Sequence, residues 1–464
     1  MQRQMKTYHP TFADNETARA VHAPNIPSIP HSTLSMSDRT VAITFTVLLI
    51  VKAAIAFALL PALTHYLGDN YHAALFPDDY DLIAENLING HGYRVYADTS
   101  ETMLRSPGFV LILAAIFALF GKSLLAVQIV QYGMSTTIAI VIYLIAQRLF
   151  ATRPVSLLAS ALFLFHPVSL LSDTRAGNDT TLTFCLTITL WLLLRSIDRR
   201  RPMDFALTGL ALGYTMLVKA SVALIFPAVF LFLFWSPEIR FRRWLLVRDF
   251  AITAVVAAAV MAPWVVRNYA ISGQFVPTMT VQGLAIFQGE EAERNSASGQ
   301  DSWRLLDDAS HVQTAIGHEM GLRMREDFFP QFYDVRDEIA FYSELGRRGW
   351  AEYRKDPALL ARTVVHNSWA FWFQGRTANA TALNVVILLP FILMSVYGAT
   401  LAVRRDRKSW ILVIAIVTFI VPHLVIIAVS RYCATVVPIM CIFAACGLFT
   451  PAAHRLLFRH SVTI

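Results

Sequence analysis

The sequence predicts an all-α polytopic membrane protein with about ten transmembrane helices, in a range of roughly nine to twelve. Interfacial helices and a small extracytoplasmic segment of mixed structure are expected in addition. Hydrophobic residues make up 56% of the 464 residues and charged residues only 15%, whereas soluble domains carry about 25% charged residues. The apolar residues form long runs with arginine clusters at their ends, as in helices that cross a bilayer.

The net charge of +7 does not indicate binding to nucleic acid, because the basic residues lie at the ends of apolar runs. All four cysteines lie inside apolar runs, so the sequence predicts no extracytoplasmic disulfide framework. The polar start of the chain lacks the short basic region of a cleavable signal peptide, and the first apolar run is therefore expected to be an uncleaved anchor.

The spans follow from the apolar runs. They are predicted at residues 41–64, 124–147, 155–171, 180–195, 204–218, 220–235, 250–266, 379–403, 410–429 and 433–450. Alternate connections are rich in arginine, for example at Arg199, Arg200 and Arg201. The positive-inside bias puts these connections, and both termini, in the cytoplasm.

The apolar run at 107–120 is too short to be counted as a span, since runs of 10–14 residues are more often interfacial. Counting it would also invert the orientation of every later arginine cluster. We therefore expect a surface helix at the end of the first outer loop.

Five regions are predicted from this topology. They are a disordered cytoplasmic tail at 1–40, a transmembrane catalytic module at 41–266 with its first outer loop at 65–123, an extracytoplasmic loop or cap at 267–378, C-terminal transmembrane helices at 379–450, and a cytoplasmic tail at 451–464. The cap is at the low end of what folds independently, so it is expected to lean on the membrane part.

Carboxylates cluster at the start of a predicted helix in the first outer loop. Asp78, Asp79 and Asp81 surround Tyr80 and precede apolar residues at helical spacing. N-capping explains one aspartate, because its side chain accepts hydrogen bonds from the free N–H groups of the helix. Three carboxylates beside a membrane exceed what capping needs, and we predict a functional acidic site.

A second acidic site is predicted at Asp173 and Asp179, where one helix ends and the next begins. Helix capping explains these two residues equally well, since Asp179 is followed by two threonines.

Four cations are expected on the same outer side, namely Arg105, Lys219, Arg267 and Arg431. Each alone has an ordinary explanation, such as a lysine that snorkels to the interface. Together they favour binding of an anionic lipid headgroup, because arginine and lysine side chains bind phosphate.

No cofactor is certain. The histidines of the outer segments lack the spacing of metal ligands. The neighbouring carboxylates could hold Mg²⁺ or Mn²⁺, but oxygen ligands are too common in loops to decide this. No P-loop, GxGxxG or GxSxG motif is present, which argues against a nucleotide-driven pump or a serine hydrolase.

Most of residues 41–450 resembles the GT-C membrane glycosyltransferases, particularly bacterial relatives of the protein O-mannosyltransferases and of the lipid A aminoarabinose transferases. The landmarks, in order, are the acidic loop before YDLIAENLINGHGY, then RSPGFVLILA, LFGKS, NDTTLTF, the lysine after GYTMLV, PWVVRNY, and SRY followed by VVP.

The resemblance implies transfer of a hexosyl or pentosyl group from a polyprenyl-phosphate donor to a lipid, glycan or protein acceptor. The reaction would take place on the outer face of the bacterial inner membrane. An aspartate of the first loop would be the general base, as it removes the proton of the acceptor hydroxyl. Fixed cations would stabilise the phosphate leaving group.

The resemblance assigns the base to Asp78 or Asp79. Relatives often have an acid four residues before the tyrosine, where this chain has Phe76, so the choice among these two and Asp81 stays open. Further residues resemble family positions, namely Asp179 as the second acid, and Arg105 and Lys219 as cations near the lipid phosphate.

Two other functions compete with this interpretation. A transporter or lipid flippase would have charges at the bilayer midplane and inverted repeats with broken helices, and the sequence shows neither. A glycan polymerase or ligase shares the substrates but not the early acidic loop.

Overall fold

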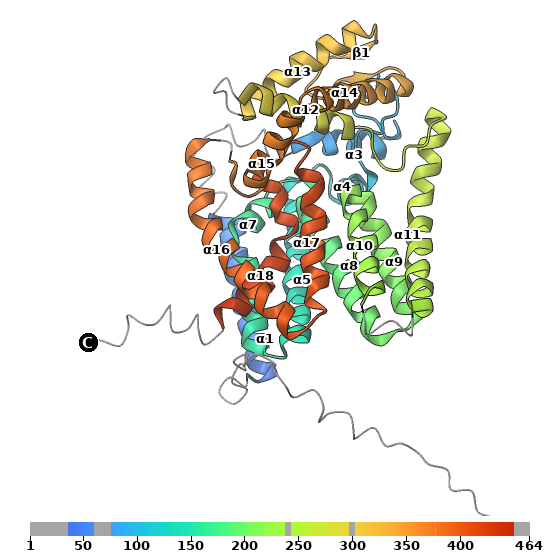
Figure 1. Ribbon diagram of the computed structural model, residues 1–464. Helices are drawn as coiled ribbons and strands as arrows, with labels where there is room; N and C mark the ends of the chain where they lie inside the picture. Colours follow the sequence, from blue (N-terminus) through green and yellow to red (C-terminus); the bar gives the residue numbers. More distant parts are fainter. Residues whose placement is uncertain (1–35, 60–75, 237–242, 297–301, 376, 450–464) are drawn as a thin grey trace, which may run out of the picture.

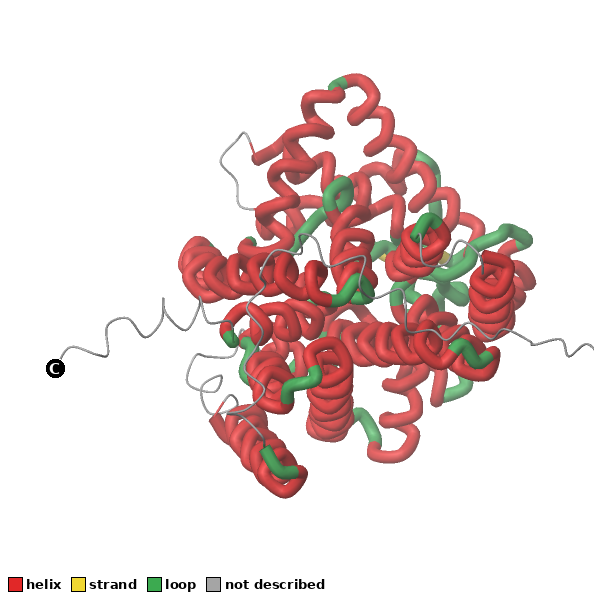
Figure 2. Tube along the Cα trace, turned by 60° about the horizontal axis from the view of Figure 1, so that its bottom comes forward, coloured by secondary structure: helices red, strands yellow, loops and turns green. Residues whose placement is uncertain are grey.

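The computed structural model describes residues 36–59, 76–236, 243–296, 302–375 and 377–449. Helices form nearly all of this part of the chain (Figure 2), which confirms the predicted all-α class. The strands β1 (Met324–Arg325) and β2 (Gln331–Phe332) pair in antiparallel fashion. The expected disordered tail up to residue 35, residues 65–75 of the first outer loop and the C-terminal tail lie outside the described residues.

The membrane part is a bundle of apolar helices (Figure 1). The helices long enough to span, by length and composition, are α1 with its π-helical extension (Asp38–Leu59), α5 (Leu124–Phe150), α8 (Asn178–Arg199), α11 (Arg243–Ser272) and α16 (Ala378–Arg405). A sixth consists of α6 (Arg153–Leu164) and α7 (Pro167–Asp173), which meet at a bend of 54°. Pro167 lacks the N–H that a continuous helix needs at this bend.

Shorter apolar helices complete the bundle. They are α4 (Pro107–Phe120), α9 (Pro202–Val218), the 3₁₀ turn η4 (Ala220–Leu224) with α10 (Ile225–Phe234), α17 (Ser409–His423) and α18 (Val437–Leu448). Apart from α4, the apolar helices correspond one to one with the ten predicted spans. The helix α4 packs against α3 (Tyr80–Ile88), α5 and α9.

Most predicted spans differ from the observed helices by a few residues, and the C-terminal ends of α11 and α17 differ most. Helix α11 continues to Ser272, because Asn268 donates a hydrogen bond to the carbonyl of Val276 at 2.8 Å and ties the helix end to the next segment. Helix α17 ends at His423 and not at residue 429. Asn367 of α15 (Pro357–Phe373) holds the chain that follows, by donating to the carbonyls of Leu424 and Ile426 at 3.1 and 2.7 Å.

Close helix contacts depend on glycines. Gly209 and Gly213 lie one turn apart on α9, and a Cβ there would come within 2.6 and 2.7 Å of the carbonyl oxygens of Thr253 and Ala257 on α11. Small residues at this spacing let membrane helices approach each other closely.

The cap lies over one end of the bundle (Figure 1). Its helices are α12 (Gln282–Ser296), α13 (Ser302–Glu319), α14 (Val335–Lys355) and α15. Its buried side chains share one hydrophobic cluster with the first outer loop, in which Phe332 and Tyr342 of the cap join Ile83 of α3 and Phe109 of α4. The cap and residues 76–120 therefore pack around one common core.

Candidate active site

The acidic turn η3 (Pro77–Asp79) has a strained backbone. Asp78 and Asp79 have φ values of 70° and 59°, in the left-handed region, which costs residues other than glycine about 1–3 kcal/mol. Asp79 is the N-cap residue of α3, yet its side chain makes no capping hydrogen bond. Capping therefore does not account for Asp79, and strain of this kind clusters at functional sites.

Two arginines from distant parts of the chain converge on Asp78. Arg105 donates from Nε to the Asp78 carbonyl at 2.9 Å, and its Nη2 lies 3.6 Å from Oδ1. Arg431, in the 3₁₀ helix η6 (Ser430–Thr435), donates from Nη2 to Oδ2 of Asp78 at 2.9 Å. Burial disfavours the charged carboxylate, but the charges of Arg431 and Arg105 hold the pKa of Asp78 below its usual value. Asp78 is therefore an ionised anion held between two guanidinium groups.

The neighbouring Asp79 has a different environment. It is half-buried, and no other described residue hydrogen-bonds or ion-pairs with its carboxylate. Burial raises the pKa of Asp79 to about 6, against the opposing charge of Arg105. A carboxylate with such a pKa can accept and release a proton near neutral pH.

Lys219 and Asp179 lie close to the same acids. Lys219 separates α9 from η4, and its Nζ lies 4.2 Å from the centre of the Tyr432 ring. Burial lowers the pKa of Lys219 to about 8, and the charges of Asp179 and Asp78 oppose this shift. Asp179 stands in the first turn of α8, where its neighbour Asn178 donates to the Tyr80 hydroxyl at 3.0 Å.

The structure thus brings together most of the predicted site residues. We call this group the acid–cation cluster. Its members are Asp78, Asp79, Arg105, Asp179, Lys219 and Arg431.

Three other predicted residues lie outside the cluster. Asp81 pairs with Lys122 at 2.9 Å. Asp173 is buried in the bundle, where it pairs with Lys52 of α1. Arg267 pairs with Glu101 at 2.9 Å and donates to the Thr102 carbonyl, also at 2.9 Å, so its charge holds the loop that leads to α4.

Nothing in the sequence marks some of the residues in this region as part of the site. The ring of Phe329, from the cap, lies 4.2 Å from the Arg105 guanidinium carbon. Glu338 of α14 is 3% exposed and accepts hydrogen bonds from Thr102, Met103 and Thr280 at 2.6, 3.0 and 2.6 Å. These contacts fix the loop before Arg105 against the cap, and only the folded chain brings their partners together.

In the part of the chain that the structure describes, no group of three His, Cys, Asp or Glu side chains could hold a metal ion. A role for Mg²⁺ or Mn²⁺ stays a prediction.

Gly108 lets the start of α4 approach the end of α9 closely. A Cβ at this position would lie 2.7 Å from the Val218 side chain and 2.9 Å from the Leu217 backbone. The Gly108 carbonyl also accepts a hydrogen bond from Tyr214 at 2.9 Å. The start of α4 therefore rests directly on the end of α9.

Replacing Gly108 with valine is expected to destabilise the protein by about 1–3 kcal/mol, because the contact with α9 has no room for a side chain. The melting temperature of the purified protein measures this. Gly133→Val on α5 is the control, since nothing lies within 4 Å of a Cβ there. Equal melting temperatures for the two variants would contradict the role of the contact.

Part of this chain matches the model of a known protein family. Residues 104–266 match the family model described as dolichyl-phosphate-mannose-protein mannosyltransferase, which is less than half of the chain. The matched part contains Arg105, Asp179 and Lys219. Curated proteins give no match.

A solved oligosaccharyltransferase shares the fold of this chain. The oligosaccharyltransferase of Archaeoglobus fulgidus in its apo form matches with a TM-score of 0.52 and 12% identity, over 91% of this chain and 51% of that one. The same enzyme tethered to an acceptor peptide gives a TM-score of 0.50 and 13% identity, over 91% and 51%. ArnT from Cupriavidus metallidurans in the apo state gives a TM-score of 0.39 and 13% identity, over 85% and 78%.

This chain spans about half the length of the oligosaccharyltransferase that it matches. The chain therefore has the fold of the GT-C membrane glycosyltransferases, and its residues 104–266 are similar to the dolichyl-phosphate-mannose-protein mannosyltransferases.

Proposed function

We propose that this protein transfers a sugar from a polyprenyl-phosphate donor to an acceptor at the acid–cation cluster. The observation that carries the proposal is the convergence of Arg105 and Arg431 on the carboxylate of Asp78. Polyprenyl-phosphate sugars are also the donor class in the description of the matching family. The acceptor is a lipid, glycan or protein.

The two arginines and Lys219 would bind the phosphate of the donor. Guanidinium groups bind phosphate oxygens in pairs, and a lysine adds a point charge. In the structure two of these cations, Arg105 and Arg431, pair with an anion, the Asp78 carboxylate, which supports this proposal. The same cations would stabilise the charge that grows on the phosphate when the bond from the anomeric carbon to the phosphate oxygen breaks.

Asp79 is the proposed general base. Its carboxylate would take the proton from the acceptor hydroxyl as the acceptor oxygen attacks the anomeric carbon. A base needs a carboxylate free to receive a proton, and Asp78 is engaged by two cations. The contrast between the two neighbours, one held ionised and one with a pKa of about 6, supports this division of roles.

The cluster would face the outside of the cytoplasmic membrane. Arginine-rich connections such as Arg199–Arg201 lie at the far end of α8 from Asp179, and the positive-inside bias puts that end in the cytoplasm. Both termini would be cytoplasmic.

Mass spectrometry of cell-envelope glycans and glycolipids, with and without the protein, tests the proposed function. We expect one glycosylated species to disappear when the gene is deleted and to return with the wild-type gene. Unchanged envelope glycans in the deletion strain would overturn the proposal.

Replacing Arg431 with glutamine is expected to lower the transfer rate by about 10²–10³-fold, because one donor to the developing phosphate charge is lost. The measurement is the initial rate in proteoliposomes at several concentrations of a polyprenyl-phosphate donor that carries the sugar missing from the deletion strain. Arg336→Gln, an exposed position on α14, is the control and should keep the wild-type rate. Equal rates for the two variants would show that Arg431 does not bind the phosphate.

The transfer rate is expected to rise with pH through about 6. Below the pKa of Asp79 the carboxyl is protonated and cannot accept another proton, whereas above it the carboxylate is free. A profile of kcat/KM between pH 5 and 8 would measure this, with a fluorescence melting curve at each pH to show that the protein stays folded. A rate that does not change across this range would argue against Asp79 as the base.

A further inference from the structure

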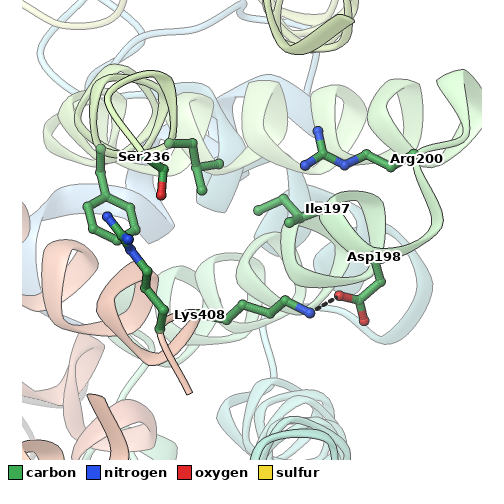
Figure 3. Close-up of a pocket in the computed structure, with 8 residues that line it drawn as sticks. Ile197, Asp198, Arg200, Ser236 and Lys408 are labelled. Atoms are coloured by element: carbon green, nitrogen blue, oxygen red, sulfur yellow. Dashed lines mark hydrogen bonds and ion pairs between the residues drawn. The ribbon is translucent and has the colours of Figure 1, made fainter. Parts of the chain in front are cut away.

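A cavity of about 500 Å³ lies among the residues drawn in Figure 3. It is at the end of α8 opposite Asp179 of the acid–cation cluster. Its walls include Asp198, Arg200, Phe232, Leu233, Arg407 and Lys408. Helix α8 runs from Asp179 in the cluster to this cavity, which places the two sites about 30 Å apart at 1.5 Å per residue. The volume is within the range of about 300–1,000 Å³ that small-molecule sites have.

Positive charge dominates the cavity. Lys408 pairs with Asp198 at 2.7 Å, and Asp198 also pairs with Arg148. The Arg407 guanidinium carbon lies 5.5 Å from the centre of the Phe232 ring. Among the described residues no carboxylate pairs with Arg200, which follows the last turn of α8. The described residues that line the cavity include three cations and one carboxylate, and this excess of positive charge suits an anion.

Exposed tryptophans show how deep the cavity lies. Trp235 directly follows α10, and Trp244 and Trp410 are the second residues of α11 and α17. Their exposed fractions are 67%, 76% and 42%. Tryptophan side chains gather where lipid headgroups meet water. The cavity, which opens beside the ends of α10 and α17, is therefore at the level of the headgroups.

We propose that the cavity binds the phosphate headgroup of an anionic membrane phospholipid. Arg200 and Arg407 would hold the phosphate, while Phe232 and Leu233 would contact the apolar part that follows it. Basic pockets between membrane helices at this depth suit such headgroups. A zwitterionic lipid fits less well, because its ammonium group would meet the same cations. This site does not depend on the proposed sugar transfer.

Native mass spectrometry of the full-length protein tests the proposal, with phosphatidylglycerol and phosphatidylcholine titrated separately in detergent. We expect phosphatidylglycerol to bind at least tenfold more tightly than phosphatidylcholine. The double variant Arg200→Gln/Arg407→Gln should lose this preference. The matched control Arg199→Gln/Arg404→Gln removes two exposed arginines from the same end of the bundle but outside the cavity walls, and it should keep the preference.

Equal binding of phosphatidylglycerol by the two double variants would overturn the proposal. A second experiment adds soluble glycerol phosphate as a competitor of phosphatidylglycerol. If it displaces phosphatidylglycerol at equal concentration, the site takes a soluble phosphate and the lipid proposal fails. The single variant Arg407→Gln lies in a turn and leaves α8 untouched, so it should show a partial loss even if the double variant does not fold. An unchanged preference in a folded Arg407→Gln protein would also count against the proposal.

Discussion

Replacing Asp79 with asparagine is expected to reduce sugar transfer by about 10²–10⁴-fold, which is what a general base contributes. The amide keeps the size of the carboxylate but cannot take a proton. The fold should survive, since no described residue ion-pairs with Asp79. The rate in proteoliposomes measures the effect, and the melting temperature reports on the fold.

Asp98→Asn is the matched control, because Asp98 is exposed in the same outer loop and makes only a long ion pair of 3.5 Å with Arg325. It should keep the wild-type rate. Asp78→Asn separates the roles of the two neighbours. If Asp78→Asn abolishes transfer while Asp79→Asn keeps the wild-type rate, Asp78 is the base and our assignment is wrong.

Replacing Lys52 with methionine is expected to destabilise the protein by about 3–5 kcal/mol, because breaking a buried ion pair leaves one charge uncompensated. Lys52 has an exposed fraction of 0% and lies 2.7 Å from the Asp173 carboxylate. It also donates to Ser135 at 2.5 Å, while Asp173 accepts from Thr180 at 3.0 Å. The free energy of unfolding in mixed micelles measures the loss.

The double variant Lys52→Met/Asp173→Leu tests this explanation. Replacing both charges by apolar groups of similar size is often neutral or stabilising, so we expect it to recover most of the lost free energy. A double variant as unstable as Lys52→Met alone would show that the packing of Lys52, and not its charge, stabilises the bundle.

Hydropathy predicted the helices of the membrane part because each span is a local property of the chain. The ends of the spans were less predictable, since contacts from far along the sequence decide them. Asn367 takes up the carbonyls of Leu424 and Ile426 and so ends α17 early. Nothing in the sequence near residue 424 indicates this partner.

The cluster was predictable to the extent that single charged residues interrupt apolar segments, as Lys219 and Arg431 do. The sequence suggests one acidic site at Asp173 and Asp179, because the two residues are close in the chain. The bend between α6 and α7 instead places Asp173 beside Lys52, a single charged residue inside the first apolar run. Partners from the cap, such as Phe329, depend on tertiary structure alone.

The hydrophobic cluster that joins the cap to the first outer loop limits how this protein can be re-engineered or can diverge. A cap transplanted from a protein of the same fold would meet a foreign partner surface at Ile83 and Phe109, and would leave both halves of the cluster poorly packed. Residues 76–120 and the cap would therefore have to be exchanged together, although they lie far apart in the sequence. Divergence of the cap would therefore require coordinated change in two stretches separated by more than half of the transmembrane helices.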